Sequence, residues 1–307
     1  MFKNIKSNYI LGVVFKVYLK EKKYLQIVKC NKNIKKRLNI SLNNYKTFKK
    51  IEIELIPINE LEEPEEKYNF INIKNPEEKK YYHIYFNNNR KEEEINRTYI
   101  IKEDKINTIN IVIDEQITSL SELFNNCSCL KSINFTKFNR NNITNMTRMF
   151  RECDELINLD ISKLITDNVQ NMSFMFNGCN KLEKLNLSNF NTKSVTNMRY
   201  MFSGCSLLKE LNLNNFDTKN VKNMSNMFSA CNNLEKLDIS NFNTENVVYM
   251  NEMFFCCYSL DYLDISNLTI SPKCTDKNMF AECSEELWNA VKKQNNNLEY
   301  KPFEEVY

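Results

Sequence analysis

Apolar side chains recur along this chain with a period of 26 residues. Met-Phe pairs begin at six positions that keep this interval: Met149, Met175, Met201, Met227, Met253 and Met279. Cysteines follow the same interval, at Cys127, Cys153, Cys179, Cys205, Cys231, Cys257 and Cys283. Because so many positions hold one register, the sequence predicts six or seven structural repeats that stack and share one core.

Each repeat contains two different apolar periods. Leu185, Asn186 and Leu187 alternate between apolar and polar, which is typical of a short strand with one buried face. The next segment has the spacing of one helical face, with apolar residues at Val195, Met198, Met201, Phe202 and Cys205. Asn197 stands where its side chain can cap the start of such a helix. We therefore expect each repeat to be a strand, a turn, a short helix and a return loop.

The repeats are flanked by segments with other patterns. Residues 1–47 carry helical apolar stripes, and residues 48–118 alternate like the strands of a small sheet that covers the first repeat. The repeats themselves extend over residues 119–283. Residues 284–307 begin with an amphipathic helix in which Leu287 and Val291 lie on one side. This segment is expected to cap the last repeat.

The repeats resemble a known family. The phrases NLSNFNTKSVTNMRYMFSGCSLLKELNL and NLNNFDTKNVKNMSNMFSACNNLEKLDI are similar to BspA-like leucine-rich repeats. This resemblance implies an α/β fold, a leucine-rich-repeat solenoid of 26-residue strand–helix units. It also implies a binding role, with the strands lining a concave, partner-facing surface. Many members of the family are described as surface proteins.

A second resemblance concerns the N-terminal segment. The stretch SNYILGVVFKVYLKEKKYLQIVKCNKNIKKRL is similar in spacing to an F-box, although the usual Leu-Pro is missing and Gly12 lies inside the expected helix. The resemblance implies that residues 1–47 bind a Skp1-like adaptor and that the repeats select substrates for ubiquitination. The alternative is a helical cap or small domain without a ligase role.

Composition and charge narrow the choice of function. The chain has one histidine and three glycines, so no GxGxxG or GxxxxGK motif is present and His-dependent catalysis has little basis. We expect no enzymatic activity, no cofactor and no small-molecule substrate. Residues 1–50 contain 14 Lys or Arg against one Glu. This segment could bind an acidic partner, nucleic acid or a membrane surface, or merely reflect a lysine-rich composition.

The cysteines are interpreted as small buried hydrophobes. Equivalent side chains on neighbouring repeats should lie about 4.8 Å apart, beyond the usual Cβ separation of a disulfide. The chain has 11 cysteines, and an odd number favours free thiols in a reducing compartment. We therefore predict a cytoplasmic protein, with the cell surface as the alternative. Asp238 and Asp264 are a candidate pair for calcium, but water and Lys236 can satisfy them, so we expect no metal site.

The candidate binding residues are the polar strand positions that point away from the core. They are Asn158, Asp160, Lys184, Asn186, Glu210, Asn212, Lys236, Asp238, Tyr262 and Asp264. The sequence thus predicts a monomeric, non-enzymatic protein that binds another protein through this face, as an intracellular adaptor or substrate-recognition protein. A cell-surface adhesin is the first alternative, and binding of nucleic acid or membrane by the basic N-terminus is the second.

Overall fold

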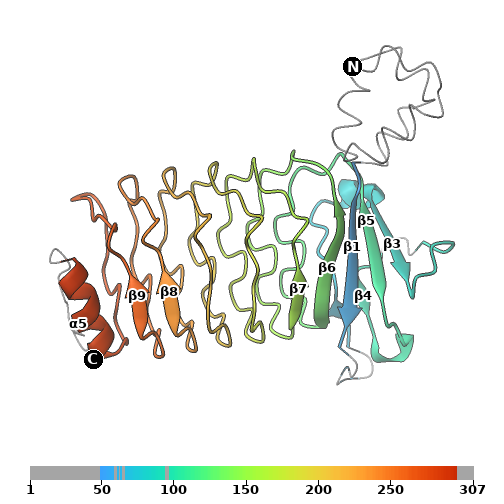
Figure 1. The fold of residues 1–307 in the computed structure, drawn as a ribbon. Coiled ribbons are helices and arrows are strands. Elements are labelled where there is room, and N and C mark those ends of the chain that lie inside the picture. The colour runs from blue at the N-terminus through green and yellow to red at the C-terminus, as the bar shows by residue number, and fades with distance from the viewer. Residues whose placement is uncertain (1–48, 59–60, 62, 64–65, 94–96, 296–307) are drawn as a thin grey trace, which may run out of the picture. The chain divides into compact units, whose positions relative to one another are not determined.

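The computed structural model describes residues 49–58, 61, 63, 66–93 and 97–295. The chain divides into two compact parts, Met1–Lys50 and Ile51–Tyr307. The helical module expected at residues 1–47, with its F-box resemblance, lies outside the described residues, as does the tail from residue 296. The second part contains an N-terminal sheet, the repeats and a C-terminal helix (Figure 1).

The N-terminal sheet joins the first two repeats. Its strand order is β3-β5-β1-β6-β7, and its strands are β1 (Ile51–Pro57), β3 (Tyr82–Phe86), β5 (Ile109–Ile113), β6 (Leu130–Phe138) and β7 (Asn158–Asp160). All neighbours are antiparallel except β6 and β7, which are parallel. Buried residues alternate along β1, whereas every residue of β5 is buried, as expected for a strand covered on both faces. Because it combines antiparallel and parallel pairs of strands, the sheet is mixed.

Smaller elements complete this region. They are the paired strands β2 (Tyr68–Asn69) and β4 (Tyr99–Ile100) and the 3-10 helices η2 (Pro76–Tyr81) and η3 (Lys102–Asp104). A buried arginine ties the sheet to the first repeat, since Arg140 is 2% exposed and its Nη1 donates to the carbonyl of Asp114 at 2.7 Å. The pairing of β1 with β6 covers the strand edge of the first repeat, which would otherwise be open to another chain.

The segments expected to be helices in the repeats are chains of turns. In the repeat that contains Phe176, the amides of Met175, Asn177 and Cys179 each donate to the carbonyl three residues earlier. The amides between them donate instead to the next repeat, 25 residues further along, as Phe176 N does to Met201 O at 2.9 Å. The spacing that resembled a helical face thus belongs to turns whose hydrogen bonds are shared between neighbours.

Left-handed residues prevent these turns from continuing as a helix. Phe174 and Gly178 have φ values of 59° and 76°, and equivalent pairs recur in the other repeats. Two left-handed residues four positions apart in this segment are incompatible with the right-handed helix that the apolar spacing suggested. Gly178 and Gly204 also adopt the left-handed conformation, and each ends a turn.

Apart from β6, whose nine residues lie in the first repeat, the strands of the repeats are short. They are β7 and the parallel pair β8 (Lys236–Asp238) and β9 (Tyr262–Asp264). Within the described repeats, Lys184–Asn186 has no strand assignment, and Glu210 joins Lys236 through a single bridge. Few residues are helical, and the sheets are small and mixed. The prediction of an α/β leucine-rich-repeat solenoid built from strand–helix units is therefore wrong.

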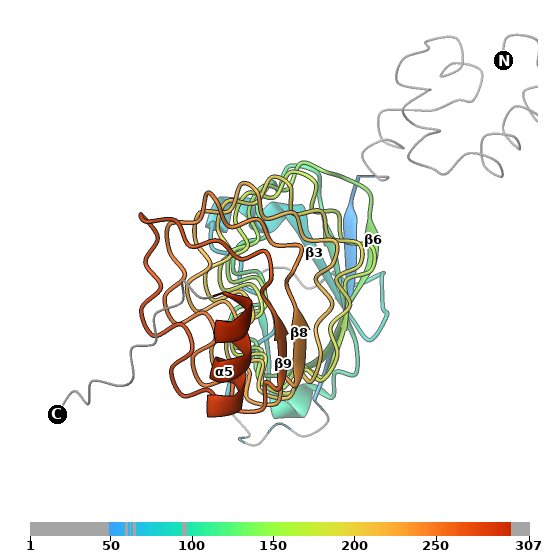
Figure 2. The ribbon, with the colours of Figure 1, turned by 60° about the vertical axis from the view of Figure 1, so that its left-hand side comes forward.

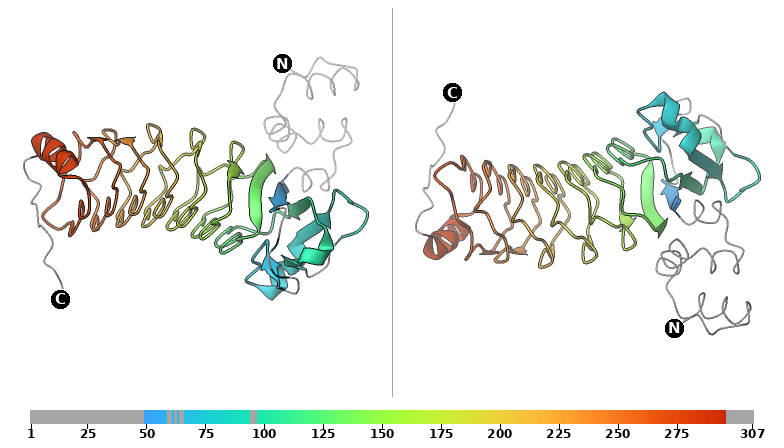
Figure 3. Two further views of the ribbon diagram at one scale, coloured as in Figure 1. Left: turned by 90° about the horizontal axis from the view of Figure 1, so that it is seen from below. Right: turned by 90° about the horizontal axis from the view of Figure 1, so that it is seen from above.

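The apolar positions nevertheless form the core that the sequence indicates. Successive phenylalanine rings stack from Phe124 to Phe280, with centroids 5.2–5.8 Å apart and planes within 12° of parallel. Cysteine, leucine and methionine side chains fill the space around them and are almost completely buried. Seen from above and below, the repeats follow one another side by side from β6 to α5 (Figure 3).

Amide and hydroxyl side chains connect neighbouring repeats. Asn215 Nδ2 donates to the carbonyls of Leu187 and Phe190 at 3.0 and 2.7 Å, and Asn189 and Asn241 make the same pair of bonds in their own repeats. The buried Thr192 hydroxyl donates to Asp217 O and accepts from Asp217 N. These bonds satisfy backbone groups that a short strand leaves unpaired.

Helix α5 (Glu285–Gln294) occupies the segment where the sequence predicts an amphipathic helix (Figure 2). Ser284 caps it, because its Oγ accepts from Leu287 N at 3.1 Å. Leu287 and Val291 are buried, and the Trp288 ring lies 5.9 Å from that of Phe280, so the helix covers the end of the phenylalanine stack. Among the described residues, no helix has both the length and the apolar character needed to cross a bilayer.

Candidate functional site

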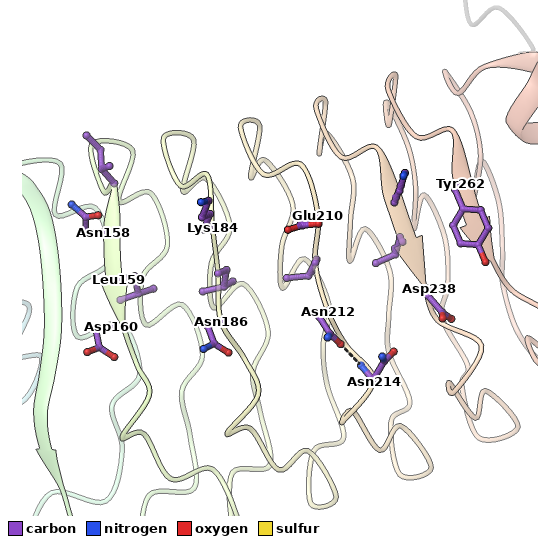
Figure 4. Close-up of a pocket in the computed structure, with 15 residues that line it drawn as sticks. Asn158, Leu159, Asp160, Lys184, Asn186, Glu210, Asn212, Asn214, Asp238 and Tyr262 are labelled. Atoms are coloured by element: carbon purple, nitrogen blue, oxygen red, sulfur yellow. Dashed lines mark hydrogen bonds between the residues drawn. The ribbon is translucent and has the colours of Figure 1, made fainter.

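A groove of about 810 Å³ runs along the strand side of five successive repeats (Figure 4). We call it the strand-face groove. It is lined by Ile157, Asn158, Leu159, Asp160, Lys184, Leu185, Asn186, Glu210, Leu211, Asn212, Asn214, Lys236, Leu237, Asp238 and Tyr262. Nine of the ten residues predicted to bind a partner lie in it. Whether a partner binds there stays a prediction.

Most of the lining falls into three parallel rows that run along the repeats, the first with five residues and the other two with four. The first row is Asn158, Lys184, Glu210, Lys236 and Tyr262. The second is Leu159, Leu185, Leu211 and Leu237, and the third is Asp160, Asn186, Asn212 and Asp238. The leucines are mostly buried, with Leu185 9% and Leu237 1% exposed, so they supply a narrow apolar floor between two polar rows.

The first row carries charges that have no partner among the described residues. Lys184, Glu210 and Lys236 are exposed, and within the described part of the chain none of them is within ion-pair distance of an opposite charge. Elsewhere on the surface Lys181 pairs with Glu155 at 2.6 Å, so the repeats do form such bridges when the positions allow it. The alternation of positive, negative and positive charge is therefore available to a partner.

The third row also has a structural role, which the sequence pattern did not indicate. Each of its side chains accepts a hydrogen bond from the backbone amide two residues later, as Asn212 Oδ1 does from Asn214 N at 3.0 Å. Asp and Asn favour this local turn because their short side chains reach the backbone. Hydrogen bonds from Ser240 lower the pKa of Asp238, and those from Ser162 lower that of Asp160. One oxygen of each side chain is thus already engaged.

The tenth predicted residue lies outside the groove. Asp264 Oδ1 accepts from Ser266 N at 2.9 Å, and the adjoining backbone is bonded to α5. Gln294 donates to Leu263 O and accepts from Ile265 N, both at 2.9 Å. The C-terminal helix therefore occupies the position that the next strand would take, and Asp264 belongs to this junction rather than to the open part of the strand face.

Of the two apolar ends of the groove, Tyr262 was among the predicted binding residues and Ile157 was not. Ile157 is 43% exposed and Tyr262 51% exposed, at opposite ends of the lining. Position 157 holds Lys or an acidic residue in the other repeats, as in Glu183 and Lys209. Ile157 thus departs from the charge pattern of its position, and this difference was visible in the sequence.

The cysteines that recur every 26 residues have the environment of buried, unreactive thiols. Cys205 is completely buried, and its thiol donates to the carbonyl of Phe176 at 3.3 Å; the equivalent thiols make the same bond. Burial raises the pKa of Cys205 to about 12. All ten cysteines that the structure describes are free. No group of three or more Cys, His, Asp or Glu side chains in the described ranges is placed to hold a metal ion.

A second surface feature lies on the turn side of the repeats. The rings of Phe174 and Tyr200 stack at 4.7 Å, with the guanidinium groups of Arg148 and Arg199 over them at 5.1 and 5.0 Å. Arg148 also pairs with Glu122 at 3.4 Å. These side chains come from the left-handed turns, so they bind neighbouring repeats to one another at the surface.

The fold and the groove together define a repeat protein whose surface varies over a constant core. Residues 118–210 and 205–298 match the family described as "Mycoplasma protein of unknown function, DUF285". These two tandem matches cover more than half of the chain, and the protein therefore belongs to this repeat family, which is related to BspA-like repeat proteins. No curated protein and no solved structure shows significant similarity to the chain.

Proposed function

We propose that the repeats bind another protein and that the strand-face groove is the binding surface. The observation that carries the proposal is the row Lys184, Glu210 and Lys236, whose charges have no partner within the described protein and lie beside an apolar floor. Protein interfaces combine such a partly apolar centre with charged groups that fix orientation and partner choice.

The length of the groove supports a macromolecular partner over a small ligand. Five repeats contribute to its lining, and no His, Cys or metal-binding cluster is among the lining residues. Small-molecule sites are instead concave, enclosed pockets in which a few polar groups converge on one point. The polar groups here form rows that extend along the repeats, which suits an elongated segment of a protein.

Site-specific photo-crosslinking tests this proposal in the cell from which the protein comes. A photoreactive amino acid replaces Glu210 in the full chain, and the control replaces Glu245, an exposed residue outside the groove. Neither glutamate side chain forms a hydrogen bond or ion pair within the described structure, so both replacements should leave the fold intact. Glu210 is preferable to Asn212, whose side chain holds its own turn.

The proposal predicts a discrete protein adduct from position 210 that is absent from position 245. The adduct should be lost when Lys184→Glu and Lys236→Glu are added, because these changes remove the charge pattern without touching the core. The same adducts from both positions, or none from position 210, would contradict the proposal.

A further inference from the structure

The spacing of the charged row indicates the shape of its partner. Lys184, Glu210 and Lys236 come from three successive repeats, whose core rings are 5.7 Å apart at each step. Directly paired strands would lie slightly closer, at about 4.8 Å. The two lysines are therefore separated by about 10–11 Å along the groove, with the glutamate midway between them.

An α-helix lying along the groove matches this spacing. Side chains at positions i, i+3 or i+4, and i+7 lie on one face of a helix, and the first and last are separated by about 10.5 Å along its axis. An extended strand with side chains at i, i+2 and i+4 spans about 13 Å, so its charges would lose register with the row. The interval between repeats thus favours a helix over a strand.

The ends of the groove set the length of the helix. Ile157 and Tyr262 lie in the first and fifth repeats of the lining and are 43% and 51% exposed. Four steps between repeats correspond to about 19–23 Å, and a helix of about 14 residues has a length in this range. Apolar side chains near both ends of that helix would cover Ile157 and Tyr262, and those between them would face the leucine row.

We propose that the strand-face groove binds an amphipathic α-helix of the partner protein, with acidic, basic and acidic side chains at i, i+3 or i+4, and i+7 opposite Lys184, Glu210 and Lys236. This inference rests on the proposed function and specifies its partner. Docking of a helix into a groove uses regularly spaced anchors of this kind, and the charges fix its register along the repeats.

Synthetic peptides of about 18 residues test the inference with the full-length protein. The first is a helix, stapled on its solvent face, with the acidic–basic–acidic pattern and apolar residues at both ends. The second is the same helix with the three charges reversed. The third has the acidic–basic–acidic side chains at i, i+2 and i+4 in an extended, strand-forming sequence. Affinities are measured by fluorescence anisotropy for the wild type and for the triple variant Lys184→Glu, Glu210→Lys, Lys236→Glu.

The wild type is expected to bind the first peptide about tenfold more tightly than the second, and the triple variant should show the opposite preference. Because the row is exposed, salt at about 0.5 M should reduce both preferences. Equal affinities for the two helices, tighter binding of the strand peptide, or no binding of any peptide to the wild type would overturn the helical partner.

The crosslinking experiment separates this failure from failure of the proposed function. If the adduct at position 210 forms but the crosslinked segment of the partner is extended, or lacks the charge pattern, the groove still binds a protein and the helix proposal is wrong. If the adduct does not form, the function itself is wrong. A crosslinked helix with the stated pattern supports both.

Discussion

Replacing Phe202 by alanine should destabilise the protein by about 4–5 kcal/mol, the upper part of the range for a buried phenylalanine. The ring is completely buried and is stacked on Phe176 and Phe228, with centroids 5.7 Å away on either side. Its neighbours cannot close the gap, because backbone hydrogen bonds of 2.9 Å, from Phe176 N to Met201 O and from Phe202 N to Met227 O, fix the distance between repeats. A cavity that cannot collapse keeps its full volume and therefore gives the largest loss of stability.

Urea denaturation followed by tryptophan fluorescence measures this loss. The chain contains one tryptophan, Trp288, which contacts Phe280 at the far end of the phenylalanine stack. Its signal therefore reports whether a defect at Phe202 reaches the last repeat. Tyr258→Ala is the control, since Tyr258 is 57% exposed and its loss should change the free energy of unfolding by less than about 0.5 kcal/mol. Equal shifts for the two variants, or a loss below about 1 kcal/mol for Phe202→Ala, would refute the reasoning.

Three further predictions concern side chains outside the phenylalanine stack. Asn215→Ala should lower the free energy of unfolding by about 1–2 kcal/mol, because two bonds to the preceding repeat are lost; thermal denaturation measures this. The Cys205 thiol should resist alkylation in the native protein and react only after unfolding, as read by mass spectrometry, because burial raises its pKa. Hydrogen bonds from Ser240 lower the pKa of Asp238, so the ionised carboxylate stabilises the fold at a pH above the unfolded pKa of about 3.9. This contribution is lost as the pH falls through the lower pKa of the folded protein. In urea titrations, the difference in stability between the wild type and Asp238→Ala should therefore shrink below about pH 4.

The sequence predicted which residues are buried better than it predicted their secondary structure. Met198, Met201, Phe202 and Cys205 are all buried, as their spacing indicated. That spacing is shared by one face of a helix and by a chain of turns that faces a core on one side. The two differ in where the backbone amides donate, and bonds to a repeat 25 residues away leave no local pattern in the sequence.

Left-handed turns formed by residues other than glycine were the second obstacle. Gly178 and Gly204 signal such a conformation and Asn226 has some propensity for it, but Phe174 and Tyr200 adopt it without any. Phe174 stacks on Tyr200, and Asn226 donates a hydrogen bond to Glu252 at 2.7 Å. These contacts stabilise the left-handed conformation only after the repeats have stacked. Tertiary contacts therefore determine the backbone there, and local sequence rules could not.

Equivalent positions within the chain separate structural from recognition residues in the groove. The third row of the groove holds only Asp or Asn, and each of its side chains bonds to the backbone two residues later, which these residue types favour. The first row changes from Asn158 to Lys184, Glu210, Lys236 and Tyr262, although the core beneath it is the same in each repeat. Such variation is not required by packing. Because neighbouring repeats are held at one spacing, a substitution in this row changes one side chain of the surface without disturbing the fold. A partner can therefore distinguish this protein by the order of side chains along the row.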